Sequence, residues 1–224
     1  MNGLRLPLSA GIVLAAMTLT EAAPRAGDGR IDRRALVMRH NPELRELSPS
    51  APLSVGNGQF AFTVDVTGLQ SLADVHYAEG IPLETLARWA WHSEPNPSGH
   101  ALADTTTLFD SPTGSIGLPT KADGPAGEWL RRNPHGLPLA RIALEGVVGR
   151  PRPLRREDLS AVDQVLDLWS GVIRSSYRLW EVPVLVHTAA HPERDVAALR
   201  IQSDLVRGGR LQVRIAFPRG GRGR

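Results

Sequence analysis

The sequence contains no cysteine among its 224 residues, and lysine occurs only once, at Lys121. The absence of cysteine excludes disulfide bonds and cysteine-ligated metal sites, so the folded chain must be stabilised by core packing. The sequence also lacks an internal repeat, a glycine-rich phosphate-binding loop and a heptad pattern. These absences exclude repeat arrays, P-loop nucleotide-binding proteins and coiled coils.

Positive charge is concentrated at the C-terminal end of the chain. The formal net charge is +3, but six arginines and no acidic residue follow Asp204, so the preceding residues carry a formal net charge of −3. The six are Arg207, Arg210, Arg214, Arg219, Arg222 and Arg224. Because the arginines lack a repeated interleaving with aromatic residues, the pattern does not support a nucleic-acid partner.

Residues 1–22 have the features of a secretory signal peptide. They contain one cation (Arg5), an apolar stretch from Leu6 to Leu19 and small residues before a cleavage site at Ala23. The stretch is short and contains Pro7, which disfavours the alternative of a membrane anchor; an N-terminal core helix is a further alternative. We therefore expect a secreted or periplasmic protein with no membrane association after cleavage, and a linker over residues 23–34.

The remaining sequence predicts a mainly β protein. Residues 59–67 alternate apolar and polar side chains, and about six further alternating segments follow Leu139, mostly joined by tight turns. This pattern favours an antiparallel β-sandwich over residues 35–218, followed by a basic arginine and glycine tail at 219–224. Between the strands we expect a long irregular loop region with two short helices, at Glu84–Trp91 and Ala126–Arg132.

Most motifs of catalysis or metal binding are missing. His187 and His191 are four residues apart, but His191 precedes Pro192, so the two do not share a helix face. The serines near glycine do not form a G-x-S-x-G motif. We therefore expect no metal and no cofactor, whereas an acid–base pair of carboxylates stays open because spatial separation cannot be read from sequence.

The segment RWAWHSEPNPSGH (88–100) is the most distinctive cluster of polar and aromatic residues. Indole rings stack on the apolar faces of sugars, and amide, imidazole and carboxylate groups bind sugar hydroxyls. The candidate carbohydrate-binding residues are Trp89, Trp91, His92, Glu94 and Asn96. The alternative is that the tryptophans anchor a long loop to the sandwich and bind no ligand.

Two stretches in this order resemble the N-terminal β-sandwich of six-hairpin, (α/α)6-barrel glycoside hydrolases of the kind that includes families 95 and 65. They are PLSVGNGQFAFTVDVTG (52–68) and LDLWSGVIRSSYRLWEVPVLVHTAAHPERDVAALRI (166–201). The matching positions of the second stretch are Leu166, Asp167, Leu168, Gly171, Tyr177, Val184, His191, Pro192, Asp195 and Ile201. WAWHSEPNP, with WLRRNPHGLPLARIALE (129–145), is similar to secreted bacterial members, and the resemblance covers about Ile31 to Phe217.

The resemblance implies a non-catalytic region of a secreted glycoside hydrolase in carbohydrate metabolism. In that superfamily the catalytic carboxylates come from the (α/α)6 barrel, which is absent from this chain, so we expect the chain alone to be inactive and no catalytic residue is assigned. The chain departs from the family's pattern at the hairpin turn Trp180-Glu181, which lacks the Asn-Gly or Asp-Gly favoured at that position. The alternatives are a free-standing secreted carbohydrate-binding protein that uses Trp89–Asn96, and an exported interaction protein that uses its basic tail.

Overall fold

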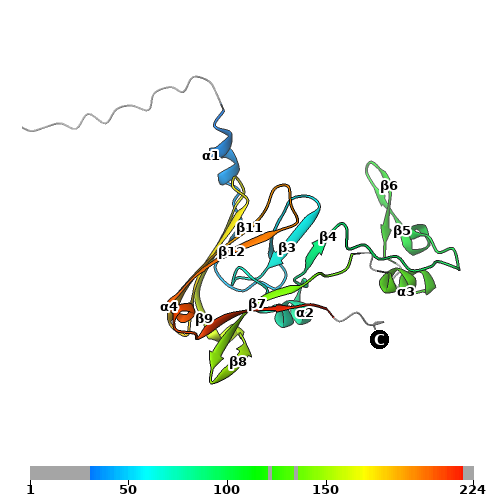
Figure 1. Ribbon diagram of the computed structural model, residues 1–224. Helices are drawn as coiled ribbons and strands as arrows, with labels where there is room; N and C mark the ends of the chain where they lie inside the picture. Colours follow the sequence, from blue (N-terminus) through cyan, green and yellow to red (C-terminus); the bar gives the residue numbers. More distant parts are fainter. Residues whose placement is uncertain (1–30, 121–122, 134–135, 219–224) are drawn as a thin grey trace, which may run out of the picture. The chain divides into compact units, whose positions relative to one another are not determined.

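The computed structural model describes residues 31–120, 123–133 and 136–218 (Figure 1). The described residues from Arg34 onward belong to one compact unit. The predicted signal peptide, residues 23–30 of the predicted linker and the basic tail lie outside the described residues. A short helix, α1 (Arg33–Met38), ends before the His40-Asn41-Pro42 turn, because the residue before a proline disfavours helical backbone.

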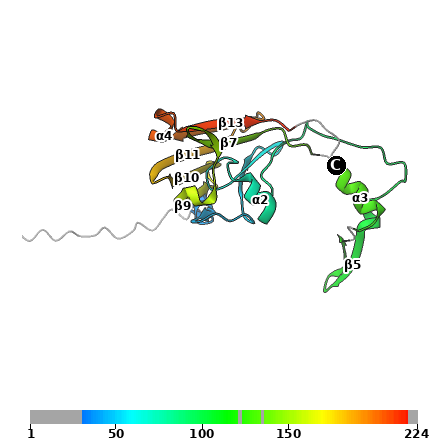
Figure 2. The same cartoon turned by 90° about the horizontal axis from the view of Figure 1, so that it is seen from below.

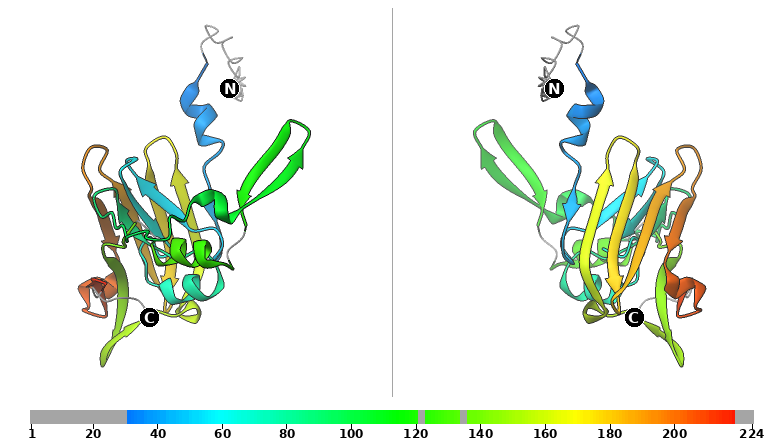
Figure 3. Two further views of the ribbon diagram at one scale, coloured as in Figure 1. Left: turned by 90° about the vertical axis from the view of Figure 1, so that its right-hand side faces the viewer. Right: turned by 90° about the vertical axis from the view of Figure 1, so that its left-hand side faces the viewer.

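The protein is mainly β, as the sequence predicted. Its largest sheet has five strands in the order β1-β9-β10-β11-β12, and each strand is antiparallel to its neighbours. Figure 3 shows β9 to β12 side by side. The bounds are β1 Glu43–Leu44, β9 Leu159–Asp167, β10 Val172–Leu179, β11 Val182–Ala190 and β12 Ala197–Gln202.

Two three-stranded antiparallel sheets, β2-β3-β4 and β13-β7-β8, pack against the largest sheet. Figure 2 shows β13 and β7 together, with β9, β10 and β11 in the neighbouring layer. The bounds are β2 Leu53–Gly56, β3 Phe60–Val64, β4 Thr85–Ala87, β7 Arg141–Val148, β8 Arg150–Pro153 and β13 Leu211–Ala216. The sandwich is therefore built from sheets whose inward side chains meet in a shared interior.

Alternating side chains of the strands form the core, as period-2 patterning requires. Along β10, the buried positions are Ile173, Ser175, Tyr177 and Leu179. One core cluster joins Tyr177 and Leu179 to Leu144 of β7, and a second joins Ile173 to the sheet β2-β3-β4. Phe60, Phe62 and Val64 of β3 are buried in that second cluster, as their alternation predicts.

The region between β3 and β7 differs from its prediction. The predicted helix at Glu84–Trp91 is wrong, because β4 occupies Thr85–Ala87 and pairs with β3. The predicted helix at Ala126–Arg132 is confirmed as α3 (Pro125–Arg132). The described residues contain four further short helical elements: α2 (Ala73–Glu79), α4 (Asp204–Arg207), and the 3-10 helices η1 (Leu102–Thr105) and η2 (Arg156–Asp158).

The predicted irregular loop also contains a β-hairpin of β5 (Thr106–Ser111) and β6 (Gly114–Pro119). Its turn is Pro112-Thr113, and the two residues flanking the turn, Ser111 and Gly114, pair directly. Proline pre-sets the backbone of a tight turn, so the sequence SPTG is the local signal for this hairpin.

The chain turns immediately after β3. The predicted strand continued to Thr67, which would place Asp65 and Thr67 on the outer, polar face. Instead the strand ends at Val64, and both polar residues are buried. The Asp65 amide donates to the Leu69 carbonyl over 2.8 Å, closing a tight loop at Gly68, whose φ of 77° suits glycine.

Candidate functional site

The tryptophan-rich segment follows β4 and lies at the surface. Trp89 and Trp91 are 69% and 63% exposed. Trp91 forms an isolated antiparallel bridge with Gly136, and its indole Nε1 donates to the Ser93 hydroxyl over 3.1 Å. Trp91 is thus held at its backbone and at one ring edge, while most of the side chain is accessible from solvent.

The predicted polar residues of this segment contact the segment itself and the end of α3. His92 Nε2 lies 3.7 Å from Glu94 Oε1. The Glu94 amide donates to Asn133 Oδ1 at the end of α3 over 3.0 Å. Asn96 exchanges two hydrogen bonds with the His100 backbone, of 2.7 and 2.9 Å. The five predicted residues therefore occupy one organised loop, and their contact with a ligand stays a prediction.

A shallow hollow of about 470 Å³ lies beside Trp91 on the sheet β2-β3-β4, and we call it the Trp91 hollow. Small residues, including Gly56, Ala61 and Gly136, make up part of its lining. A Cβ atom at Gly56 would lie 2.4 Å from the Phe60 carbonyl oxygen, so no larger residue fits there without rearrangement. The hollow offers a mostly apolar surface next to the exposed indole of Trp91.

A second hollow of about 290 Å³ is lined by polar side chains, and we call it the Asn57 hollow. Gln59 lines both hollows, so the two are adjacent. The other lining residues are Asn57, Pro192, Glu193 and Asp195. Amide and carboxylate groups are the hydrogen-bonding partners that sugar hydroxyls require, and here they stand beside an apolar surface.

Asn57 connects the two stretches of sequence that carry the family resemblance. Its Nδ2 donates to the carbonyls of His191 and Arg194, over 3.3 and 3.1 Å. Its Oδ1 accepts hydrogen bonds from the amides of Gln59 and Phe60, of 2.9 and 2.8 Å. The sequence predicted a turn at Asn57-Gly58, but it could not show that this turn meets the HPERD segment, which lies more than 130 residues later.

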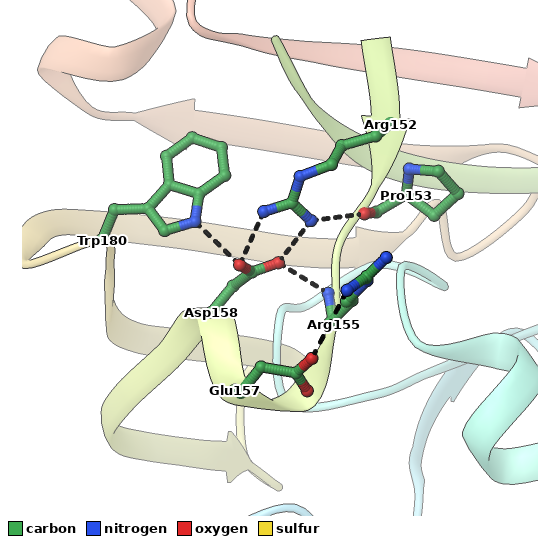
Figure 4. A network of polar contacts seen from close by, with 6 residues as sticks. All are labelled: Arg152, Pro153, Arg155, Glu157, Asp158 and Trp180. Atoms are coloured by element: carbon green, nitrogen blue, oxygen red, sulfur yellow. Dashed lines mark hydrogen bonds and ion pairs between the residues drawn. The ribbon is translucent and has the colours of Figure 1, made fainter. Parts of the chain in front are cut away.

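A second polar network surrounds Asp158, at the end of η2 (Figure 4). Its carboxylate accepts two hydrogen bonds from the Arg152 guanidinium, of 2.8 and 2.7 Å. The Trp180 indole and the Arg155 amide also donate to it, over 2.9 and 2.8 Å. Chiefly because of Arg152, with further hydrogen bonds from Trp180 and Arg155, the pKa of Asp158 is lowered to about 2.

Two arginines of this region pack on the Trp180 ring, and Trp180 is also part of a turn with positive φ angles. The guanidinium carbons of Arg152 and Arg210 lie 5.4 and 5.7 Å from its ring centroid. Trp180 and Glu181 have φ angles of 49° and 64°, and they form the two-residue turn between β10 and β11. The contacts of the ring, rather than turn propensity, hold this left-handed backbone in place.

Asp65 lies in the interior and is inaccessible to any ligand. Its Oδ1 accepts from the Thr67 amide and hydroxyl, over 2.7 and 2.6 Å, and its Oδ2 accepts from the Leu72 amide over 2.6 Å. Burial raises the pKa of Asp65, although these hydrogen bonds act in the opposite direction. The geometry is that of a structural carboxyl group that closes the loop before α2.

Within residues 31–120, 123–133 and 136–218, no cluster of three or more histidine, aspartate or glutamate side chains has the arrangement of a metal site. Among the same residues, no helix has both the length and the apolar character that crossing a membrane requires. Comparisons of the chain with models of known protein families, with curated proteins and with solved structures found no match.

Proposed function

We propose that this chain is a non-catalytic β-sandwich of a secreted carbohydrate-active protein, and that it contacts glycan at the Trp91 hollow. The observation that carries the proposal is an exposed indole, anchored through Ser93 and Gly136, next to a mostly apolar surface whose polar members include Gln59 and Arg88. A pyranose ring has one face rich in C–H groups, which packs on such a surface and stacks on an indole.

The Asn57 hollow supports a glycan rather than a purely apolar ligand. Gln59 is shared by the two hollows, and Glu193 and Asp195 line the polar one. A sugar that stacks near Trp91 thus has hydrogen-bonding groups within reach at the shared border. Since the polar hollow contains two carboxylates, neutral sugars are favoured there over sugar acids, which like charge would repel.

Two carboxyl groups whose pKa values are shifted, those of Asp65 and Asp158, are not placed for catalysis. Glycoside hydrolysis uses two carboxyl groups that flank the bond to be cleaved. Asp65 is enclosed in the core, and Asp158 is engaged by Arg152 and Trp180, so neither can act on a sugar. The non-catalytic part of the proposal itself rests on the resemblance, which assigns catalysis to a barrel. Release of reducing sugar by the purified chain would contradict this part.

The binding part is tested by screening the purified chain against immobilised glycans and then titrating the best ligand by calorimetry. Trp91→Ala is expected to weaken binding by at least about tenfold, because it removes a stacking surface worth roughly 1.4 kcal/mol or more. Trp169→Ala is a matched control, since Trp169 is an exposed tryptophan that does not line the hollow. Unchanged affinity in Trp91→Ala contradicts glycan binding at this hollow.

Trp89→Ala distinguishes glycan binding by the Trp91 hollow alone from glycan binding by the whole Trp89–Asn96 loop. Trp89 belongs to the predicted site but does not line the Trp91 hollow. If the hollow alone binds the glycan, Trp89→Ala keeps wild-type affinity. If the whole Trp89–Asn96 loop binds it, both substitutions weaken binding.

A scaffold role is the second candidate, and an exposed apolar region supports it. Tyr77 and Phe217 are about three-quarters exposed, and together with Leu83 and Ala140 they line a mostly apolar hollow of about 310 Å³. Such a surface suits packing against another domain, such as the barrel that the resemblance implies. Tyr77→Glu is expected to raise the solubility of the isolated chain without changing glycan binding, and unchanged solubility would count against this role.

A further inference from the structure

Strand β13 is the outer strand of its sheet, and one of its edges is unpaired among the described residues. It pairs with β7 on one side, and no described strand pairs with the other side (Figure 2). The Val147 amide donates to the Arg210 carbonyl over 2.8 Å. Because bonding alternates along an antiparallel pair, residues 210, 212, 214 and 216 bond to β7. The amides and carbonyls of Leu211, Val213 and Ile215 therefore point away from the sheet.

This edge has few of the devices that prevent pairing with another strand. Natural edge strands are protected by proline, by bulges or by charges that point inward. The register with β7 is continuous from Leu211 to Ala216, and the strand contains no proline. Its one charged residue, Arg214, is on the opposite face from Val213 and lies 3.3 Å from Glu145 Oε1. Val213 and Ile215 are 46% and 58% exposed.

We propose that β13 pairs with β13 of a second copy of this chain, antiparallel about a twofold axis at Val213. In this register Val213 lies opposite the partner's Val213, and Leu211 lies opposite the partner's Ile215. These are the residues whose backbone groups face outward, so each pair exchanges backbone hydrogen bonds. The pairing joins two three-stranded sheets into one six-stranded sheet.

The side chains in this register are self-complementary on both faces. On the core-facing side, Leu144 of β7 and Val213 form an apolar row that continues into the same residues of the partner. On the other side, Gln212 lies opposite the partner's Arg214, so no like charges face each other. Each Arg214 keeps Glu145 of its own chain, which balances its charge. A second copy therefore fits this edge without an unpaired charge.

The residues at the two ends of the paired strands are also compatible. Arg210 lies opposite the partner's Ala216, and its guanidinium is placed over the Trp180 ring of its own chain. The interface is small, so we expect a transient dimer with a Kd of about 10–100 µM.

Sedimentation velocity of the full chain from about 5 to about 500 µM tests the proposal, since this range spans the expected Kd. The wild type is expected to shift from monomer to dimer. Val213→Lys and Val213→Glu each place like charges on the twofold axis, so each variant alone is expected to stay monomeric. An equimolar mixture of the two is expected to recover the dimer, because opposite charges then meet.

Val196→Lys is the matched control, because Val196 is 48% exposed and lies beside β12, outside β13. It is expected to dimerise like the wild type. Circular dichroism in the aromatic region checks that the Val213 variants keep the tertiary fold. If the wild type stays monomeric, or if Val213→Lys alone still dimerises, this pairing is refuted.

Discussion

Replacement of Asp158 by asparagine tests the polar network around Trp180. The substitution preserves shape but removes the charge that accepts two hydrogen bonds from Arg152, and it leaves the Trp180 indole and the Arg155 amide with a weaker acceptor. A pKa of about 2 in the folded state, against 3.8 for an unperturbed aspartate, corresponds to a stabilisation of about 2 kcal/mol. We expect the variant to lose about that much stability at neutral pH.

The pH dependence provides the sharper check. Because the folded-state pKa of Asp158 lies below its unfolded value, its contribution is present above about pH 4 and is lost as the pH falls toward about 2. The stability difference between wild type and Asp158→Asn should therefore shrink from about 2 kcal/mol at pH 7 to near zero at about pH 2. Titration of the other carboxyl groups is common to both proteins and cancels in the difference.

Urea unfolding followed by tryptophan fluorescence measures this difference. At neutral pH the unfolding midpoint of Asp158→Asn should lie about 1 M below that of the wild type, for a chain with a slope of roughly 2 kcal/mol/M. Glu157→Gln is the control, because Glu157 is an exposed neighbour whose ion pair with Arg155 spans 3.9 Å, and we expect no measurable change. A stability difference that is equally large at pH 7 and at about pH 2 would refute the electrostatic explanation.

Two further substitutions probe the core. Gly146→Ala would place a Cβ atom 2.2 Å from Cη2 of Trp180, so we expect a loss of about 1–3 kcal/mol in urea unfolding. Gly124→Ala, which meets no neighbouring atom, should have little effect, and equal stability of the two variants would contradict the packing argument. Asp65→Asn places an amide against the Leu72 N–H and should destabilise by about 1–3 kcal/mol in acid. Because the folded-state pKa of Asp65 is raised, wild-type stability should decline as the pH rises above about 4, whereas that of Asp65→Asn should not. The stability difference between the two proteins should therefore shrink toward neutral pH. A difference that is constant with pH would contradict the raised pKa.

Much of the sheet structure is encoded locally. Phe60, Phe62 and Val64 alternate with smaller or polar residues, and a period of two places them on one side of a strand whatever the strand's neighbours. The same argument holds for β10 and β11, whose buried residues include Tyr177 and Val184. Helix α3 is also locally defined, because Pro125 suits its first turn and Asn133 ends it.

The candidate site was only partly predictable. The tryptophans are conspicuous in the sequence, and the Asn57-Gly58 turn has a clear local signal. That Gly56, Ala61 and Gly136 would stand beside Trp91 could not be predicted, since they come from different strands and a distant segment. The same applies to Asn57 and Asp195, which meet across 138 residues of sequence.

Tertiary structure decided the positions where local preference and global packing disagree. Residues 85–87 suited a helix by local pattern, yet they form β4 because the open edge of β3 supplies hydrogen-bond partners that an isolated short helix lacks. Trp180 and Glu181 adopt a left-handed turn that neither residue prefers, because Asp158 and two arginines hold the indole in place. Alternation of side chains therefore determined the strands by itself, whereas their pairing, the strained turn and the surface hollows depend on contacts between residues far apart in the chain.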